Sequence, residues 1–341
     1  MPQVTLPDGS VKQVDAGATP LAVAESISPR LAQAALVAEI DGKLVDLTTP
    51  IEADVRLRLL TDRDPEALEV YRHSAAHLLA VATLELYPDT KLGVGPPTDS
   101  GFFYDMQREK PFTPDDLEKI EQRMREIVER DLPNRRVWMD RDEALKLYRE
   151  QGDLMKCELI EEKTDDPKVS IYKTGEAFND FCRGPHIPSM GRIKAFKLLS
   201  VSGAYWKGDE RNQKLQRVYG TAFFSKKDLD AYLTQVEEAK KRDHRKLGRE
   251  LDLFSVQDTA GPGLIFWHPR GSIVRKTIED WLRDQYLKRG YGLVFTPHVA
   301  KRELWKISGH ADFYSDDMFK PMELDEVEYQ LKPMNCPFHI L

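Results

Sequence analysis

Cysteine is scarce in this sequence. The 341 residues include three cysteines, Cys157, Cys182 and Cys336, which lie far apart. This spacing argues against a disulfide framework and predicts a reducing, cytoplasmic location. No apolar run is long enough to cross a bilayer, and the first residues lack the basic and apolar segments of an export signal. We therefore expect neither a membrane-bound nor a secreted protein.

An excess of positive charge is also missing. The chain carries 50 basic and 57 acidic residues, for a net charge of -7, so it is not a broadly basic nucleic-acid binder. A local basic stripe could still contact phosphates, and residues 240–249, KKRDHRKLGR, carry six Lys or Arg residues against one Asp. Such a run on a helix is more often only a solvated face. The alternative is a strut between two domains that grip one nucleic acid.

The length predicts two or three domains. Residues 1–62 read as a small α+β module, with a hairpin around Pro7–Ser10 and a helix that starts at Thr19-Pro20. This module shows no cluster of titratable groups, which favours an interaction module without chemistry. Residues 63–225 form a second α+β unit around a helix from Leu68 to Tyr87 that is apolar nearly all round.

A linker and a third unit complete the predicted organisation, which is α+β and multidomain. Ser225 to Asp228 resemble a capping box that opens one long charged helix through residues 226–250. From residue 251 to 341 we expect a turn at Gly261–Gly263, a helix from Pro269 to Lys288 and a strand from Leu293 to Thr296. One long helix and one strand do not make a finished domain.

Two pairs of side chains in the predicted domain over residues 63–225 indicate a chemical function. His73 and His77 are four residues apart on the predicted helix, so both imidazoles lie on one face, and Cys182 and His186 show the same spacing. One histidine could be a satisfied core residue, but four such groups in one unit make that interpretation weaker. A metal site and a metal-free hydrolytic pocket tuned by Asp180 both remain open.

The order and spacing of several motifs resemble bacterial threonyl-tRNA synthetases. The motifs are HSAAHLLA, GFFYDM, DFCRGPHIP, GAYWKGD, YGTAFF, RDHRKLGRELDLF and LKPMNCP. The resemblance extends over essentially all 341 residues. It implies a β-grasp-like TGS module over 1–62, an editing domain over 63–225, a linker helix over 226–250 and the start of a class II antiparallel-sheet core over 251–341. The chain would then be an N-terminal portion of such an enzyme.

The resemblance also implies an activity. Members of this family attach threonine to tRNA(Thr) with ATP and Mg²⁺, and hydrolyse serine wrongly attached to the same tRNA. A second, hydrolytic site is needed because one missing methyl group in a pocket is worth only about 1–3 kcal/mol. Carried over by motif, the editing pocket would contain His73, His77, Lys156, Asp180, Cys182 and His186. His73 and Lys156 would orient the water and the terminal ribose, and Asp180 would recognise the amine, without a metal.

Cys336 matches a zinc ligand of the synthetic site in this family. The zinc, one per subunit, also takes two histidines that would lie beyond Leu341, so the site would be incomplete here. Phe338 stands where the family usually has a small or polar residue. Pro297 matches a motif involved in dimer contact, which implies a homodimer once the core is complete. The two ATP-gripping arginine motifs are absent, so we expect no aminoacylation by these residues alone.

Two rival functions stay open. One is a non-catalytic tRNA-binding or regulatory module, in which the N-terminal module and the basic stripe bind tRNA. The other is a zinc-dependent hydrolase that uses the His and Cys cluster. Deacylation of mischarged tRNA separates the first from editing, and metal analysis with chelator inhibition separates the second.

Overall fold

The computed structural model describes residues 1–175 and 178–341. The chain divides into two compact units, Met1–Glu238 and Ala239–Leu341, and each is described by itself. Among the described helices, none combines the length and the apolar character that a membrane span requires.

The chain begins with a five-stranded mixed sheet in the order β2-β1-β5-β3-β4. The predicted hairpin around Pro7–Ser10 is present, since β1 and β2 pair antiparallel, while β1 pairs with β5 in parallel. The side chains of Thr19 and Ser28 accept backbone N–H groups and so begin the two helices of this module, each followed by a proline. The elements are β1 (Gln3–Thr5), β2 (Val11–Gln13), α1 (Pro20–Ile27), α2 (Pro29–Ala34), β3 (Val37–Ile40), β4 (Lys43–Val45) and β5 (Val55–Leu60).

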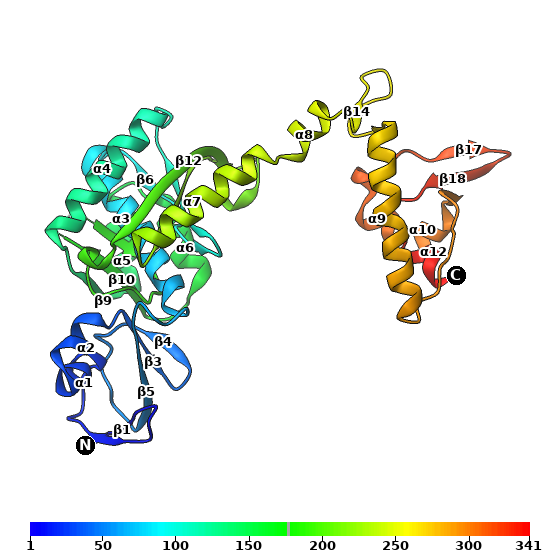
Figure 1. The fold of residues 1–341 in the computed structure, drawn as a ribbon. Coiled ribbons are helices and arrows are strands. Elements are labelled where there is room, and N and C mark those ends of the chain that lie inside the picture. The colour runs from blue at the N-terminus through cyan, green and yellow to red at the C-terminus, as the bar shows by residue number, and fades with distance from the viewer. Residues whose placement is uncertain (176–177) are drawn as a thin grey trace. The chain divides into compact units, whose positions relative to one another are not determined.

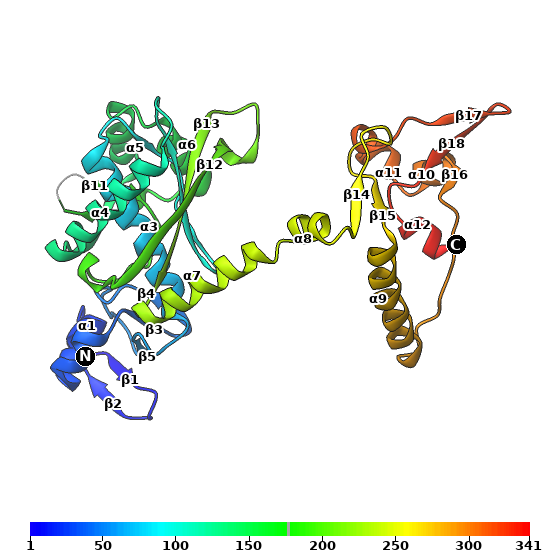
Figure 2. The same cartoon turned by 45° about the horizontal axis from the view of Figure 1, so that its top comes forward.

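Helix α3 (Ala67–Leu86) is the centre of the next part of the first unit. It is buried along most of its length, as its apolar sequence predicts, and it packs against α4, β8 and β13. Thr113 and Asp116 form a capping box that begins the amphipathic helix α4 (Pro114–Arg130). Figures 1 and 2 show α3 between α4 and the long strands. The strands are β6 (Lys91–Leu92), β7 (Pro97–Thr98), β8 (Gly101–Gln107), β12 (Ala195–Tyr205) and β13 (Lys214–Phe223), in the order β12-β13-β8-β6 with β7 on β8.

A further, three-stranded sheet has the order β11-β10-β9. Its strands pair antiparallel, and Tyr172 on the central strand lies opposite Asp180 on one neighbour and Arg136 on the other. Two helices pack on this sheet through a small apolar cluster. The elements are β9 (Asn134–Asp140), α5 (Arg141–Glu150), α6 (Leu154–Lys163), β10 (Lys168–Thr174), β11 (Phe178–Phe181) and the 3-10 turns Met190–Arg192 and Trp206–Gly208.

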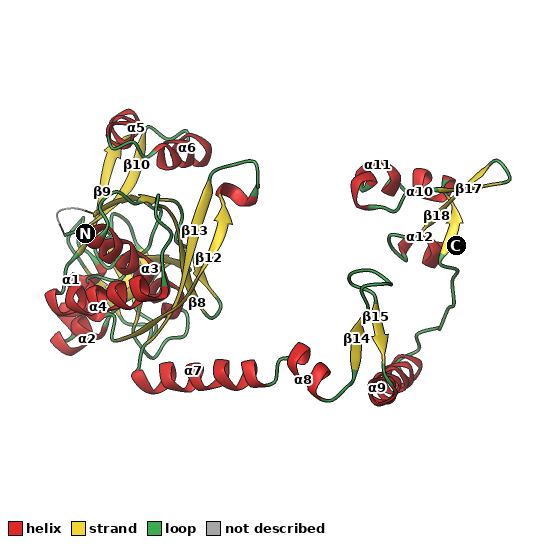
Figure 3. Ribbon diagram, turned by 90° about the horizontal axis from the view of Figure 1, so that it is seen from above, coloured by secondary structure: helices red, strands yellow, loops and turns green. Residues whose placement is uncertain are grey.

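The predicted single linker helix over residues 226–250 is wrong. The predicted capping box is present, since Ser225 and Asp228 bond each other and begin α7 (Lys226–Lys241). The helix then stops, and α8 (His244–Glu250) starts after a break that Figure 3 shows as a loop. Asp243 causes the break, because its carboxylate accepts the backbone N–H of Arg245 at 2.8 Å and caps a new helix.

The remainder of the second unit is a hairpin, a long helix and a small antiparallel sheet. The predicted turn at Gly261–Gly263 joins β14 to β15, and the predicted helix is present as α9. The predicted strand at 293–296 is wrong, because in this described region those residues pair with no strand, and the next strand is β16. The elements are β14 (Phe254–Val256), β15 (Ile265–Trp267), α9 (Pro269–Lys288), β16 (Val299–Lys301), α10 (Glu303–Ile307), α11 (His310–Phe313), the 3-10 turn Ser315–Asp317, β17 (Met322–Leu324), β18 (Val327–Leu331) and α12 (Cys336–Ile340).

Candidate hydrolytic site

The four side chains singled out by their spacing meet in one place. One ligand atom from each of His73, His77, Cys182 and His186 lies within 4.8 Å of every other. The two histidines on α3 face one another edge to face, with ring centroids 5.3 Å apart. The ring of His186 lies 4.2 Å from that of His73 and 3.9 Å from that of His77. The loop after β11 therefore closes over the helix.

The thiol of Cys182 lies at the centre of this group. Its Sγ is 3.4 Å from Nε2 of His73 and 3.3 Å from Nε2 of His186, and it accepts the backbone N–H of Gly184 at 3.3 Å. His77 and His186 are buried, whereas His73 and Cys182 are half-buried. A substrate would therefore meet His73 and Cys182 first.

Lys156 and Asp180 form a buried ion pair beside the histidines. Both are 2% exposed, and the ammonium also donates to the carbonyl of Gly93 at 2.7 Å. Asp180 Oδ2 accepts the hydroxyl of Tyr104 at 2.5 Å and lies 3.5 Å from Nε2 of His77. The pair reaches the histidine cluster through this carboxylate.

Burial sets the protonation of the cluster. It lowers the pKa of His73 to about 4 and the pKa of His77 to about 3, against the opposing charge of Asp180. Burial also moves the pKa of His186 well below its usual value. Burial and the Asp180 carboxylate raise the pKa of the Cys182 thiol to about 12. At neutral pH the cluster is three neutral imidazoles and a thiol.

Asp180 stays ionised in spite of its burial. Burial raises the pKa of this carboxyl, but the Lys156 ammonium outweighs burial and holds the pKa below its ordinary value. The site therefore contains one compensated charge pair next to uncharged nitrogen and sulfur groups.

Three further residues lie at the site and were not predicted from the sequence. Ser74 lies between the paired histidines, and its Oγ is 3.0 Å from Nδ1 of His186. Tyr104 belongs to the GFFYDM motif, which offered a hint, and Tyr172 packs edge to face on His186 with centroids 4.4 Å apart. Ser74 could have been found from its neighbours along the helix, but no local signal marks Tyr172.

The donor set can hold a metal ion. Three imidazoles and a thiol suit zinc in type and number. If all four bound, however, the coordination would be complete, and a catalytic zinc needs an open position for water. A hydrolytic metal here would therefore have to leave one of the four side chains free.

The zinc position expected at Cys336 does not have the ligands it needs. Cys336 is exposed at the start of α12 in the second unit. Among residues 1–175 and 178–341 it belongs to no group of three or more His, Cys, Asp or Glu side chains that could hold a metal. The zinc ligand at Cys336 therefore stays a prediction.

Comparison with known proteins adds a family to this geometry. Residues 2–61 match the TGS domain, and residues 169–219 match the threonyl and alanyl tRNA synthetase second additional domain. The threonine–tRNA ligase of Acidobacterium capsulatum is 56% identical over 99% of this chain and 55% of its own length. That of Nitrosococcus oceani is 52% identical over 100% of this chain and 53% of its own length.

The chain is similar to threonine–tRNA ligases along its whole length. It spans about half the length of the curated relatives that it matches. A solved structure titled as the RNA binding domain of threonyl-tRNA synthetase from Cryptosporidium parvum is 42% identical over 29% of this chain and 24% of that chain. Its TM-score of 0.28 does not establish a shared fold. The resemblance read from the motifs is thus confirmed, and so is the mixed α and β, multidomain fold class.

Proposed function

We propose that this chain is the part of a threonine–tRNA ligase that hydrolyses serine from mischarged tRNA(Thr). The observation that carries the proposal is the convergence of three neutral imidazoles and a thiol, with His73 at the accessible edge. An aminoacyl ester is already activated, so a positioned water and charge stabilisation suffice for its cleavage. The domain boundaries predicted from the sequence are part of the same proposal, with two helices in place of one over residues 226–250.

The proposed reaction is attack of water on the ester carbonyl. The new bond joins the water oxygen to the carbonyl carbon, the bond to the ribose oxygen breaks, and a proton passes to that oxygen, which releases serine and free tRNA. With a pKa of about 4, His73 accepts a hydrogen bond from water rather than carrying a proton at neutral pH. Its role is therefore to orient the water.

Lys156 and Asp180 are given supporting roles in this proposal. Their contacts are made with each other, Tyr104, Gly93 and His77, so they hold the inner wall of the pocket. Direct contact of Lys156 with the ribose, or of Asp180 with the amine, requires the pocket to open when tRNA binds. These two contacts stay predictions.

Deacylation of Ser-tRNA(Thr) by the purified 341-residue chain tests the proposal. Replacing His73 by Ala should slow release of serine by roughly 100-fold or more, because water would lose its partner. His298→Ala, at an exposed histidine of the second unit, is the matched control and should keep the wild-type rate. A wild-type chain that binds tRNA(Thr) without releasing serine would favour the non-catalytic module instead.

A zinc-dependent hydrolase is the second candidate, and the four convergent ligand atoms favour it. It is separated by metal analysis of the purified chain and by deacylation with and without a chelator. Loss of activity on chelation and its return with Zn²⁺ would support this candidate. Unchanged deacylation by metal-free protein would exclude it.

Ligation of threonine to tRNA(Thr) with ATP and Mg²⁺ belongs to the proposal for the whole protein. For these 341 residues we expect no pyrophosphate exchange with threonine and ATP.

The proposal also includes the homodimer. Helix α9 exposes large apolar side chains that a partner would cover, among them Ile273, Ile278 and Trp281. The cytoplasmic location predicted from the sequence is part of the same proposal.

A further inference from the structure

One carboxylate of the N-terminal module, that of Asp46, lies at the hydrolytic site. Asp46 follows β4, is 5% exposed, and its Oδ1 accepts the backbone N–H of His186 at 2.8 Å. Its Oδ2 accepts the hydroxyl of Tyr172 at 2.6 Å and lies 3.5 Å from Nη1 of Arg136. Both oxygens of a residue from the module that was expected to have no chemistry are thus used on the site.

These bonds act on the loop that carries His186. His186 lies in the loop after β11, outside regular secondary structure. Its ring is held by Ser74 on one side and by the ring of Tyr172 on another. Asp46 fixes the backbone of His186 and the hydroxyl of Tyr172 at once, so it sets the position of the imidazole relative to Cys182.

Close packing leaves this loop little room to adjust. A Cβ atom placed on Gly184 would lie 1.9 Å from the hydroxyl oxygen of Tyr172, so the loop backbone passes directly over that hydroxyl. Loss of the bond that Tyr172 donates to Asp46 would free the hydroxyl on which the loop backbone packs. The Asp46 carboxylate therefore supports the loop at two points, the backbone of His186 and the hydroxyl of Tyr172.

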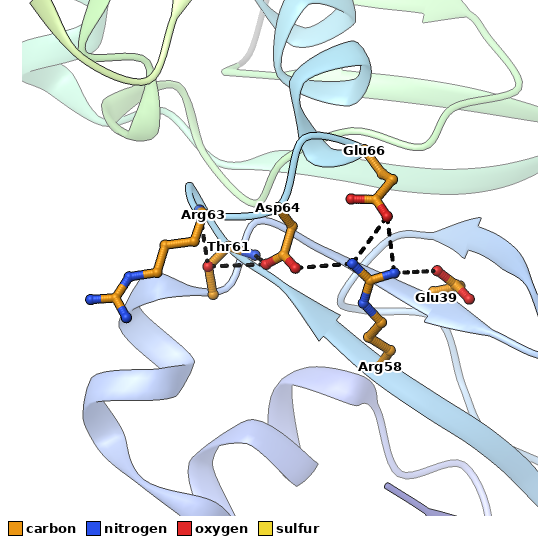
Figure 4. A network of polar contacts seen from close by, with 6 residues as sticks. All are labelled: Glu39, Arg58, Thr61, Arg63, Asp64 and Glu66. Atoms are coloured by element: carbon orange, nitrogen blue, oxygen red, sulfur yellow. Dashed lines mark hydrogen bonds and ion pairs between the residues drawn. The ribbon is translucent and has the colours of Figure 1, made fainter. Parts of the chain in front are cut away.

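A second set of contacts joins the N-terminal module to the start of α3. Figure 4 shows Arg58 on β5 bonded to Glu39, Asp64 and Glu66, the last two just before α3. The distances are 3.0 to 3.3 Å. Because α3 carries His73 and His77, this network joins the module to the helix side of the pocket, while Asp46 joins it to the loop side.

We infer that Asp46 is a positioning residue for the hydrolytic site, and that the N-terminal module is a structural part of that site. The inference rests on the proposed function for its kinetic consequence. Its structural consequence, order in the loop that carries His186, is independent of any activity.

Hydrogen exchange and single-turnover deacylation of Ser-tRNA(Thr) by the 341-residue chain test it together. Asp46→Ala removes both acceptors and should speed exchange in residues 183–187 while α3 stays protected. The maximal deacylation rate should fall by roughly tenfold or more, with the KM for tRNA unchanged, because small displacements of reacting groups cost rate rather than binding. Asp46→Asn keeps an acceptor for the His186 N–H and should stay within about threefold of wild type.

Asp54→Ala is the matched control, since Asp54 belongs to the same module but accepts the backbone N–H of Gln3 instead. It should leave both exchange in 183–187 and the rate unchanged. If Asp46→Ala does not fold, Tyr172→Phe decides, because it removes only the hydroxyl; a fall of about threefold or more supports the inference. The inference is overturned if Asp46→Ala folds and shows the wild-type hydrogen exchange and deacylation rate. Where Asp46→Ala does not fold, the same result for Tyr172→Phe overturns it.

The two proposals fail separately. A wild-type chain without deacylase activity overturns the proposed function, and exchange in residues 183–187 then still decides the role of Asp46. An active wild type with an equally active Asp46→Ala overturns the role of Asp46 alone.

Discussion

Nδ1 of His186 lies 3.0 Å from the hydroxyl oxygen of Ser74. The single hydroxyl proton of Ser74 is donated to the carbonyl of Val70 at 2.9 Å, and the same oxygen accepts the N–H of Ile187 at 3.1 Å. On this assignment of protons His186 carries its own proton on Nδ1 and donates it to Ser74. The lone pair on Nε2 then faces the thiol of Cys182.

Ser74→Ala should therefore destabilise the first unit. The ring Nδ1–H of His186 and the backbone N–H of Ile187 would be buried without a partner, which costs about 1–3 kcal/mol of unfolding free energy. Urea unfolding measures this. Ser10→Ala, at an exposed serine bonded to Asp8, should change stability by less than about 0.5 kcal/mol. Equal stability of Ser74→Ala and wild type would contradict the buried network.

Removing one partner of the Lys156–Asp180 ion pair should lower the unfolding free energy more than replacing both partners. Asp180→Asn leaves the Lys156 ammonium buried without a counter-charge, so the unfolding free energy should fall by about 3–5 kcal/mol. Lys156→Met combined with Asp180→Asn should recover part of that loss, because no uncompensated charge remains. A double variant less stable than Asp180→Asn would show that the pair is not coupled as described.

Acid should destabilise the first unit well above the pH at which its carboxylates titrate. An unfolded histidine has a pKa of about 6.5, so between pH 7 and pH 5 the unfolded chain takes up protons that native His73 and His77 refuse. Stability must therefore rise with pH across this window. Each of the two residues should contribute about 2 kcal/mol between pH 5 and pH 7.

Urea unfolding at pH 5 and pH 7 measures that dependence. Replacement of His77 by Gln removes one of the titrating groups and should flatten the curve. A wild-type stability that does not change between these two values of pH would mean that the buried histidines titrate normally in the native state.

The thiol of Cys182 should react slowly with alkylating reagents. Thiolate is the reactive species, and a pKa of about 12 leaves very little of it at neutral pH. At pH 7.5 iodoacetamide should label the exposed Cys336 first, with Cys182 reacting at a comparable rate only after unfolding. Mass spectrometry of digested protein follows both. Rapid labelling of native Cys182 would mean that the thiolate is populated and that the thiol is a nucleophile.

Local patterns predicted most of the elements correctly. The hairpin at Pro7–Ser10, the cap at Thr19, the buried helix with His73 and His77, and the turn at Gly261–Gly263 all depend on residues close in sequence. The two errors arose where a local signal had a competitor. Asp243 caps a new helix inside a charged run, and residues 293–296 have strand-like composition but no described strand to pair with.

Spacing along the chain is enough to place His73 and His77 on one helix face and to make Cys182 and His186 a second pair. The meeting of the two pairs depends on the tertiary structure, since the contact of Cys182 with His73 spans 109 residues. It also decided that Asp46 reaches His186 across 140 residues. Such contacts depend on how sheets and helices pack, and burial in that packing is what keeps the imidazoles neutral.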